Sequence, residues 1–407
     1  MASTLVVVPI ILIAAFAASE LFKRLRFPPV VGQILAGMIF GIPLIEAALF
    51  GYESRSVVDF LSILGIVFLL FLAGLEIDID KVRATSRDSV MISFSAALVP
   101  LFLGFLFLRV MGYDFLTSLV VGGALSVTSE ATKVKVLMDL NSLNTRLGAI
   151  MVAAGAIDDI FEVTFLSLVI VLAHGGSLFE LVLIPVELVT FVIIAFVFFK
   201  VISKALHYLE NNGGDETELF SMIMIFVLVL AALSDVMQLG YLIGAIIGGF
   251  LLQLSLRNIH QKHREDMIRM TKMITLAFVV PFFFANVGLN FNFETISTNL
   301  TLLIGLVIIA FVGKIVGTII VKPASSLSLK QLYYVGWAMN SRGAAELVIA
   351  LIALQFALIP QEVFSALVAM AIITTLTFPF VLSRGIKKNP ELMDRISPQE
   401  RKHFQAS

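Results

Sequence analysis

The sequence contains no cysteine and few charged residues. Without cysteine the chain has no disulfide, no thiolate metal site and no catalytic thiol. Lysine, arginine, aspartate and glutamate make up 14% of the 407 residues, whereas soluble domains average about 25%. The formal net charge is −1, so no basic surface is available for nucleic acid. The five histidines are scattered, and neither a His-rich metal site nor a cofactor-binding motif is visible.

Apolar residues, by contrast, are in excess. They make up 59% of the sequence, and the mean hydropathy is +1.02. Because a helix of about 20 apolar residues crosses a bilayer, these runs predict an all-α polytopic membrane protein. No soluble domain fits anywhere along the chain. About thirteen transmembrane helices are predicted, near residues 4–22, 28–45, 59–76, 88–111, 115–138, 144–172, 178–205, 217–235, 238–256, 268–289, 299–321, 331–354 and 361–384.

Basic residues mark one end of these helices. The segments that follow odd-numbered helices are rich in lysine and arginine, beginning with KRLR at 23–26, while the alternate loops hold almost none apart from Arg55. Cytoplasmic loops of membrane proteins carry this excess. We therefore expect the N-terminus outside and the C-terminus in the cytoplasm. The N-terminal apolar run lacks a basic n-region and is interpreted as a first helix rather than a cleaved signal peptide.

The second half of the chain repeats features of the first. Each repeat would hold six helices with the seventh as a linker, and an odd linker inverts the second copy. Inverted repeats with a site near the midplane are typical of secondary transporters. Single matches between apolar segments are weak, but four occur in order at nearly one offset: Gly37 with Gly249, Gly74 with Gly288, Ser129 with Arg342, and Asp159 with Thr374.

Two predicted helices carry polar interruptions at their centres. SVTSEATKV lies in the fifth helix and MNSRGAAE in the twelfth. Serine and threonine compete for backbone hydrogen bonds, and irregular backbone at membrane depth is tolerated where it is buried in protein or lines a cavity. We expect both helices to be broken and to cross near the midplane.

Charged residues beside these interruptions have two interpretations. Glu130 would begin the second half of the fifth helix, where an acid complements the positive helix end. Arg342 is badly placed for its own helix and should pair with Glu346 or with the negative end of another half-helix. The alternative is that Glu130–Lys133 and Arg342–Glu346 are local ion pairs that only neutralise charge.

Three carboxylates lie within the apolar sixth helix, in AAGAIDDIFE. A charge at the bilayer centre costs at least roughly 2.5–3.5 kcal/mol, so Asp158, Asp159 and Glu162 must pair, protonate or bind cations. Lys314 is a cation available on another membrane span. The simplest arrangement pairs one aspartate with Lys314 and leaves the other facing the crossing, and the two neighbouring acids titrate as a coupled set. A carboxylate that swaps a proton for a metal cation is the minimum machinery of an exchanger.

The order of these motifs resembles a known transporter superfamily. VTSE in a broken helix, GAIDD in the next, Lys in AFVGKIVG and then NSRGAAELVIA are similar to the monovalent cation/proton antiporter superfamily, most of all to its NapA/NhaA-like branch with paired aspartates. The resemblance covers essentially all of residues 1–386. It implies an NhaA-type fold, a homodimer embedded in lipid, and transported Na+ or Li+ exchanged for protons, with no cofactor and no enzymatic activity.

The resemblance also assigns roles to residues. Asp159 would carry the ion or proton, Asp158 would pair with Lys314, and Thr128 or Ser129 would add an oxygen ligand. Exchange would be electrogenic, across the plasma membrane of a prokaryote. Two residues depart from the pattern: Glu130 replaces an aspartate, and Glu162 stands where relatives have a small or apolar residue.

The resemblance further divides the chain. A scaffold of 1–87 and 173–295 would support a mobile core of 88–172 and 296–386 that moves as an elevator, and 387–407 would form a cytoplasmic tail. The alternatives are a K+/H+ antiporter or K+ efflux system of the same superfamily, or a symporter or channel of related fold. An intramembrane aspartyl protease is disfavoured, because such a protease needs two aspartates on separate helices, whereas Asp158 and Asp159 are adjacent.

Overall fold

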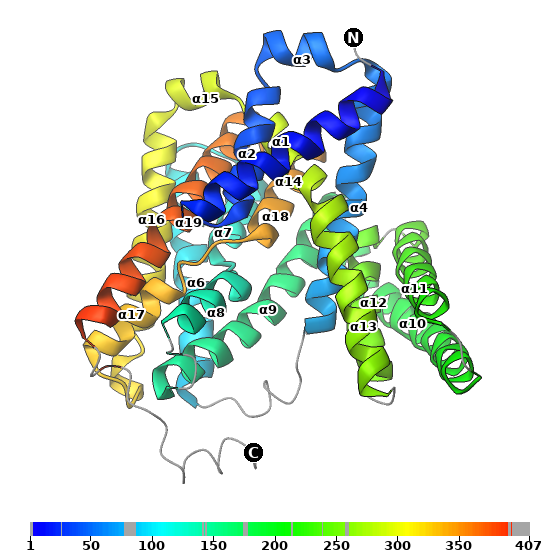
Figure 1. The fold of residues 1–407 in the computed structure, drawn as a ribbon. Coiled ribbons are helices and arrows are strands. Elements are labelled where there is room, and N and C mark those ends of the chain that lie inside the picture. The colour runs from blue at the N-terminus through cyan, green and yellow to red at the C-terminus, as the bar shows by residue number, and fades with distance from the viewer. Residues whose placement is uncertain are drawn as a thin grey trace. The chain divides into compact units, whose positions relative to one another are not determined.

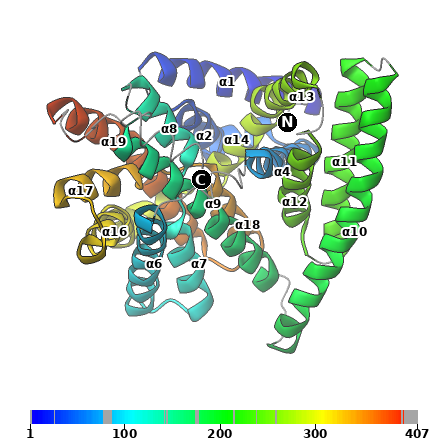
Figure 2. The ribbon, with the colours of Figure 1, turned by 90° about the horizontal axis from the view of Figure 1, so that it is seen from below.

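The computed structural model describes residues 3–25, 27–76, 87–140, 142, 145–173, 178–212, 215–237, 239–256, 260–389 and 392. Its regular elements are helices, drawn in Figures 1 and 2. By their internal contacts they form two compact units, each built from two separate parts of the chain. The first is Met1–Ile77 with Ser167–Asn290, and the second is Asp78–Leu166 with Phe291–Ser407.

The first unit contains the N-terminal helices and the middle of the chain. In it α10 and α11 lie side by side (Figures 1 and 2). A single π-helical segment, η1 (Thr275–Val279), joins α13 to α14. The helices are α1 (Thr4–Arg24), α2 (Pro29–Phe40), α3 (Pro43–Leu49), α4 (Tyr52–Glu76), α10 (Leu178–Asn211), α11 (Glu216–Val236), α12 (Tyr241–Leu256), α13 (Gln261–Ile274) and α14 (Val280–Leu289).

The second unit contains the polar motifs of the sequence. Its first helices pack closely, with α6 against both α7 and α16. The helices are α6 (Arg87–Val110), α7 (Phe115–Ser126), α8 (Glu130–Asp139), α9 (Arg146–Ala173, divided between the units after Leu166), α15 (Phe293–Thr298), α16 (Leu300–Ile319), the short 3-10 helix η2 (Lys322–Ala324), α17 (Leu329–Ala338), α18 (Ala344–Gln355) and α19 (Gln361–Lys388).

Eight helices in the described part of the chain are long and apolar enough to cross a membrane. A ninth span is possible from α2 and α3, which bend by 82° at their junction. Other predicted spans contain shorter apolar helices, including α7, α12 and α18. The protein is therefore an all-helical polytopic membrane protein, and the count of thirteen spans stays a prediction.

One boundary differs from the sequence analysis. The tenth span was expected to begin at residue 268, after a polar loop, but α13 already begins at Gln261. Met267 and Thr271, one turn apart, are buried, and Asp266 pairs with Arg269 at 2.6 Å. The charged stretch is helical because it has one buried face, which a count of charges does not reveal.

Glycines bring helices α2 and α14 into backbone contact. A Cβ atom added to Gly37 would overlap the carbonyl oxygen of Ala285, and one added to Gly288 would overlap that of Ile34. The two helices therefore pack without side chains between them at this level, as small residues allow in membrane proteins.

The same arrangement recurs between α4 and α12. A Cβ added to Gly74 would overlap the carbonyl oxygen of Ile246, and one added to Gly249 would overlap that of Phe71. Gly249 and Gly74 are the residues that the sequence matched with Gly37 and Gly288. Their contact partners also match at the same offsets: Ile34 with Ile246, and Phe71 with Ala285.

Arg55, the basic residue that departs from the charge pattern, is surrounded by acceptors within the first unit. Its guanidinium lies 3.2 Å from Glu46 and 3.6 Å from Asp59, and it donates to Asn290 at 3.1 Å. The positive charge is thus neutralised locally and ties α3 and α14 to the start of α4. This explains how a loop that is otherwise poor in basic residues accommodates it.

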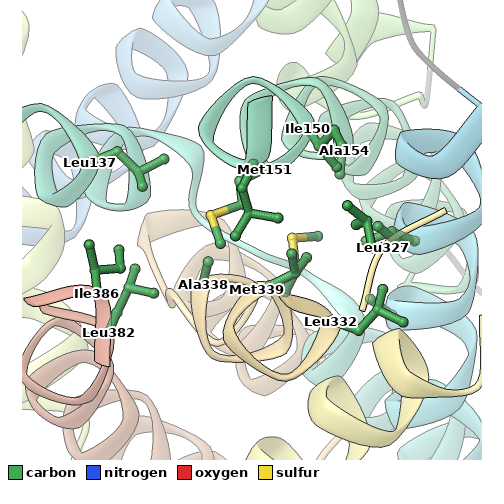
Figure 3. Close-up of a cluster of buried hydrophobic side chains, with 14 residues drawn as sticks. Leu137, Ile150, Met151, Ala154, Leu327, Leu332, Ala338, Met339, Leu382 and Ile386 are labelled. Carbon is green, nitrogen blue, oxygen red and sulfur yellow. The ribbon is translucent and has the colours of Figure 1, made fainter. Parts of the chain in front are cut away.

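A continuous apolar core supports the second unit. It joins α6, α8, α9, α17 and α19, and Figure 3 shows Met151 of α9 and Met339 after α17 near its centre. Leu332 and Leu382 are fully buried in the same cluster. This core holds one helix beside each polar interruption, α8 and α17, and so it helps to determine where the polar groups can meet.

We predict that Gly249→Ala destabilises the protein, because its methyl group would displace the backbone of α4. Overpacking of this kind costs about 1–3 kcal/mol. The neighbouring Gly248 is a matched control, since a Cβ there would lie 3.2 Å from the flexible Cδ1 of Leu230. Thermal unfolding in detergent should show a clearly lower melting temperature for Gly249→Ala and little change in melting temperature for Gly248→Ala. Equal melting temperatures would contradict the backbone contact.

Candidate functional site

Both predicted helix interruptions are present. Helix α7 ends at Ser126, and α8 begins at Glu130 after extended residues Val127 and Ser129. Helix α17 ends at Ala338, and α18 begins only at Ala344. Each interruption exposes the carbonyl end of one short helix and the amide end of the next.

The two interruptions contact each other directly. The amide of Ser129 donates to the carbonyl of Ser341 at 2.7 Å, and the hydroxyl of Ser341 donates to the carbonyl of Ser129 at 2.7 Å. Gly343 makes this approach possible, because a Cβ there would lie 2.5 Å from the Ser129 hydroxyl. The extended segments therefore satisfy each other's backbone groups, as unhydrated backbone at membrane depth requires.

Arg342 lies at the carbonyl end of α7. Its Nη1 donates to the carbonyls of Leu125 and Val127, both at 2.8 Å, and to that of Ala124 at 3.2 Å. Its Nε is 3.6 Å from Oε2 of Glu346, a contact without a hydrogen bond. Both partners that the sequence analysis offered for Arg342 are thus present, and the helix end holds it more closely than the acid does.

Lys314 of α16 is directed to the same helix end. Its Nζ donates to the carbonyl of Ser126 at 2.5 Å and to the hydroxyl of Thr128 at 2.6 Å. The same nitrogen is 4.0 Å from Oδ2 of Asp158. The lysine therefore occupies the hydroxyl oxygen of Thr128, which the resemblance offers as a ligand of the transported cation.

Asp158 receives its hydrogen bond from a residue that the sequence analysis did not single out. Ser93 of α6 donates its hydroxyl proton to Oδ1 at 2.5 Å, while Oδ2 accepts no hydrogen bond from the described residues. Lys314, Arg342, Asp158 and Ser93 are each at most 2% exposed. Nothing in the sequence distinguishes Ser93 from other serines in apolar helices, so only its hydrogen bond to Asp158 in the folded chain reveals it.

A second buried lysine was noted in the sequence only as a local partner of Glu130. Lys133 of α8 is fully buried, and its Nζ lies 3.9 Å from the sulfur of Met339, just beyond the end of α17. The positions of Asp159 and Glu162 lie in α9 and that of Glu130 opens α8, but these three side chains fall outside the described part of the structure. Their roles, and the Glu130–Lys133 pair, stay predictions.

The described side chains thus form one buried polar cluster of both charge signs. Three cations come from different helices or their ends, and two carboxylates, Asp158 and Glu346, face two of them. No described group of three or more histidine and acidic side chains could hold a resident metal ion. Chemically, the cluster offers Oδ2 of Asp158, which accepts no hydrogen bond from the described residues. It also offers Lys314, which is hydrogen-bonded to oxygens of Ser126 and Thr128.

Comparison with known proteins gives the cluster a context. The family model described as sodium/hydrogen exchanger, transmembrane, matches residues 11–386. A Na(+)/H(+) antiporter of Enterococcus hirae is 28% identical over 381 residues, covering 93% of this chain and 97% of the relative. The Na(+)/H(+)-K(+) antiporter GerN of Bacillus cereus is 27% identical over 375 residues, covering 92% and 94%.

A solved structure shares the fold. The sodium proton antiporter MjNhaP1 from Methanocaldococcus jannaschii superimposes with a TM-score of 0.68 at 14% identity, covering 96% of this chain and 97% of that protein. At this identity the likeness establishes the fold alone. The chain accordingly has an all-helical membrane fold of the MjNhaP1 type.

We predict that Arg342→Met destabilises the protein more than Glu346→Gln. Loss of the arginine leaves three carbonyls and a buried acid without their partner, and breaking a buried pair costs about 3–5 kcal/mol. The double variant should lose less stability than the sum of the two single variants, by about 0.5–3 kcal/mol. Thermal unfolding in detergent measures all three, with the exposed Arg384→Met as control. Strictly additive losses would mean that the two side chains do not interact.

Proposed function

Because this chain belongs to the sodium/hydrogen exchanger family, we propose that it exchanges a monovalent cation, Na+ or Li+ in the first place, for protons. As a member of a cation/proton antiporter family it is a transporter and not an enzyme, and it lies in the membrane. The observation that carries the proposal is the buried cluster at the two helix interruptions. There an aspartate with a free oxygen faces a lysine that is bound to neighbouring oxygens instead.

The proposed architecture is a pair of inverted six-helix repeats within thirteen spans. Its support is the matching of glycine contacts: Gly37 meets Ala285 as Gly249 meets Phe71. In the second unit, Gly122 of α7 approaches the backbone of Leu101, and Gly336 of α17 approaches that of Ile315. Leu101 and Ile315 are 214 positions apart, as are Gly122 and Gly336. The proposal places the N-terminus outside and the C-terminus in the cytoplasm.

The proposed motion is that of an elevator. A core of 88–172 and 296–386 would carry the ion, and a scaffold of 1–87 and 173–295 would form the homodimer. Two observations support this division. The chain forms two compact units with closely similar bounds, and every described residue of the polar cluster belongs to the second unit.

The proposed cycle is a competition between the cation and Lys314. Asp159 carries the cation or the proton, and Thr128 or Ser129 adds an oxygen ligand. Asp158 pairs with Lys314, whose Nζ lies 4.0 Å from Oδ2, and gives up that pair when a proton or cation binds, while the cation also takes the Thr128 oxygen from Lys314. A cation that binds displaces the proton of Asp159, and Lys314 releases a second proton when its pair with Asp158 opens, so two protons move for one monovalent cation and exchange is proposed to be electrogenic.

A K+/H+ antiporter of the same family is the second candidate. The printed name of GerN, which is 27% identical, includes both Na(+) and K(+). The hard oxygen donors of the cluster accept either alkali ion, so the assay below uses Na+, Li+ and K+ in turn.

We predict that Asp159→Asn abolishes exchange, because an amide neither releases a proton nor offers a charge to a cation. Purified protein in liposomes with an imposed pH gradient and a pH dye measures proton movement on addition of each cation. Asp235→Asn, at the exposed end of α11, is the matched control and should exchange normally. Undiminished proton movement in Asp159→Asn would remove this residue from the ion site.

We predict that Lys314→Ala lowers both stability and the charge moved per cation. The substitution leaves Asp158 without a nearby cation, and removal of one partner of a buried pair costs about 3–5 kcal/mol. Thermal unfolding measures the first effect, and the response of exchange to an imposed membrane potential measures the second. Lys322→Ala, on the same chain segment but bonded to the carbonyl of Leu327, is the control. An unchanged melting temperature with unchanged voltage response would exclude Lys314 from the cycle.

A further inference from the structure

The hydroxyl of Ser93 donates its hydrogen bond to an acceptor that is unusual for a serine in an apolar helix. Serines in apolar helices commonly donate to a backbone carbonyl three or four residues earlier. Ser95, two positions along the same helix, does this with Met91 at 2.7 Å. Ser93 instead donates across the helix interface to Oδ1 of Asp158 at 2.5 Å, with both side chains buried.

Helix α6, which carries Ser93, packs closely against α16. Gly317 of α16 lies against the carbonyl of Ser95, and Gly313 lies against Pro100. These glycines flank Lys314 at one position before and three positions after it. The close approach of α6 and α16 therefore places Ser93 and Lys314 on two sides of one carboxylate, and the tight interface resists their separation.

The two oxygens of Asp158 consequently have different surroundings. Oδ1 accepts the Ser93 proton, and Oδ2 faces Lys314 without a hydrogen bond. Lys314 is itself bonded to Ser126 and Thr128. Among the residues that the structure describes, Ser93 is the one hydrogen-bond donor to Asp158, so the serine rather than the lysine fixes the orientation of this carboxylate.

We propose that Ser93 is a positioning residue for exchange, which holds Oδ1 so that Oδ2 stays directed at Lys314. This inference rests on the proposed function. A hydrogen bond from a hydroxyl to a carboxylate is charge-assisted and therefore strong. Ser93 thereby keeps Asp158 oriented as the partner of Lys314.

Other charges act on the same carboxylate and define what the test must separate. Lys314 faces it from α16, and Arg342, at the start of α18, interacts with it electrostatically. Asp159 and Glu162 share its own helix. The contribution of α6 at this point is the neutral hydroxyl of Ser93, so its removal changes hydrogen bonding without changing the net charge of the site.

The test compares Ser93→Ala, Ser93→Thr and Ser95→Ala in liposomes, by the dependence of cation-driven proton movement on an imposed membrane potential, here called the voltage profile. Without its donor, the Asp158 carboxylate is no longer held toward Lys314, and the pair should weaken about tenfold, the value of one hydrogen bond to a charged group. Exchange by Ser93→Ala should therefore depend less steeply on the membrane potential than exchange by the wild type. Ser93→Thr, which keeps the hydroxyl, should restore the wild-type voltage profile, and Ser95→Ala should retain it.

Each outcome decides the proposal. A wild-type voltage profile in Ser93→Ala, or a Thr variant that behaves like the Ala variant, would overturn the role of Ser93 while leaving the exchanger intact. Absence of cation-driven proton movement in the wild type itself would instead overturn the proposed function, and this inference with it. If Ser93→Ala fails to fold, Ser93→Cys carries the test, since it keeps the size but weakens the donor and should change the voltage profile in the same direction.

Discussion

The carbonyl end of α7 is the constraint around which the polar cluster is built. The last carbonyls of a helix have no partners within it, and at membrane depth no bulk water replaces them. Arg342 and Lys314 supply the missing donors, to Leu125, Val127 and Ser126. The negative end of the helix dipole favours both cations there. These two charges therefore have a structural role, as donors to the helix end, that does not depend on any transported ion.

The acids of the cluster are arranged around cations that are already engaged. Glu346 lies 3.6 Å from the Nε of Arg342, and Asp158 lies 4.0 Å from Lys314, in both cases without a hydrogen bond between acid and cation. Bidentate, charge-assisted pairs are far harder to separate once buried. Looser contacts keep the charges compensated yet allow partners to change, which is the property that an exchanging site requires.

Rare residues were predictable from the sequence, and common ones were not. Lys314, Arg342 and the two interruptions stood out because charge and polar backbone are expensive in an apolar chain, and the structure brings them together. Ser93 was not predicted, because it and Ser95 both lie in the same apolar stretch. Only the hydrogen bond to Asp158 on another helix distinguishes Ser93 from Ser95. The early start of α13 was missed because burial of one face, not charge, decides whether a polar stretch is helical. The sequence showed the repeated glycines, but it did not show which backbone atoms of other helices they contact.

The proposed repeat also explains why a single cluster arises from two similar halves. Ser129 aligns with Arg342, and Lys133 aligns with Glu346, so the two halves carry different charges at equivalent places. Arginine at both positions would set two like charges together, and serine at both would leave the end of α7 unfilled. Arg342 reaches the carbonyl end of α7, whereas Lys133 lies 3.9 Å from the sulfur of Met339, just beyond the end of α17. In the proposed repeat, divergence at these positions therefore lets one half supply donors to a helix end of the other without placing two arginines together.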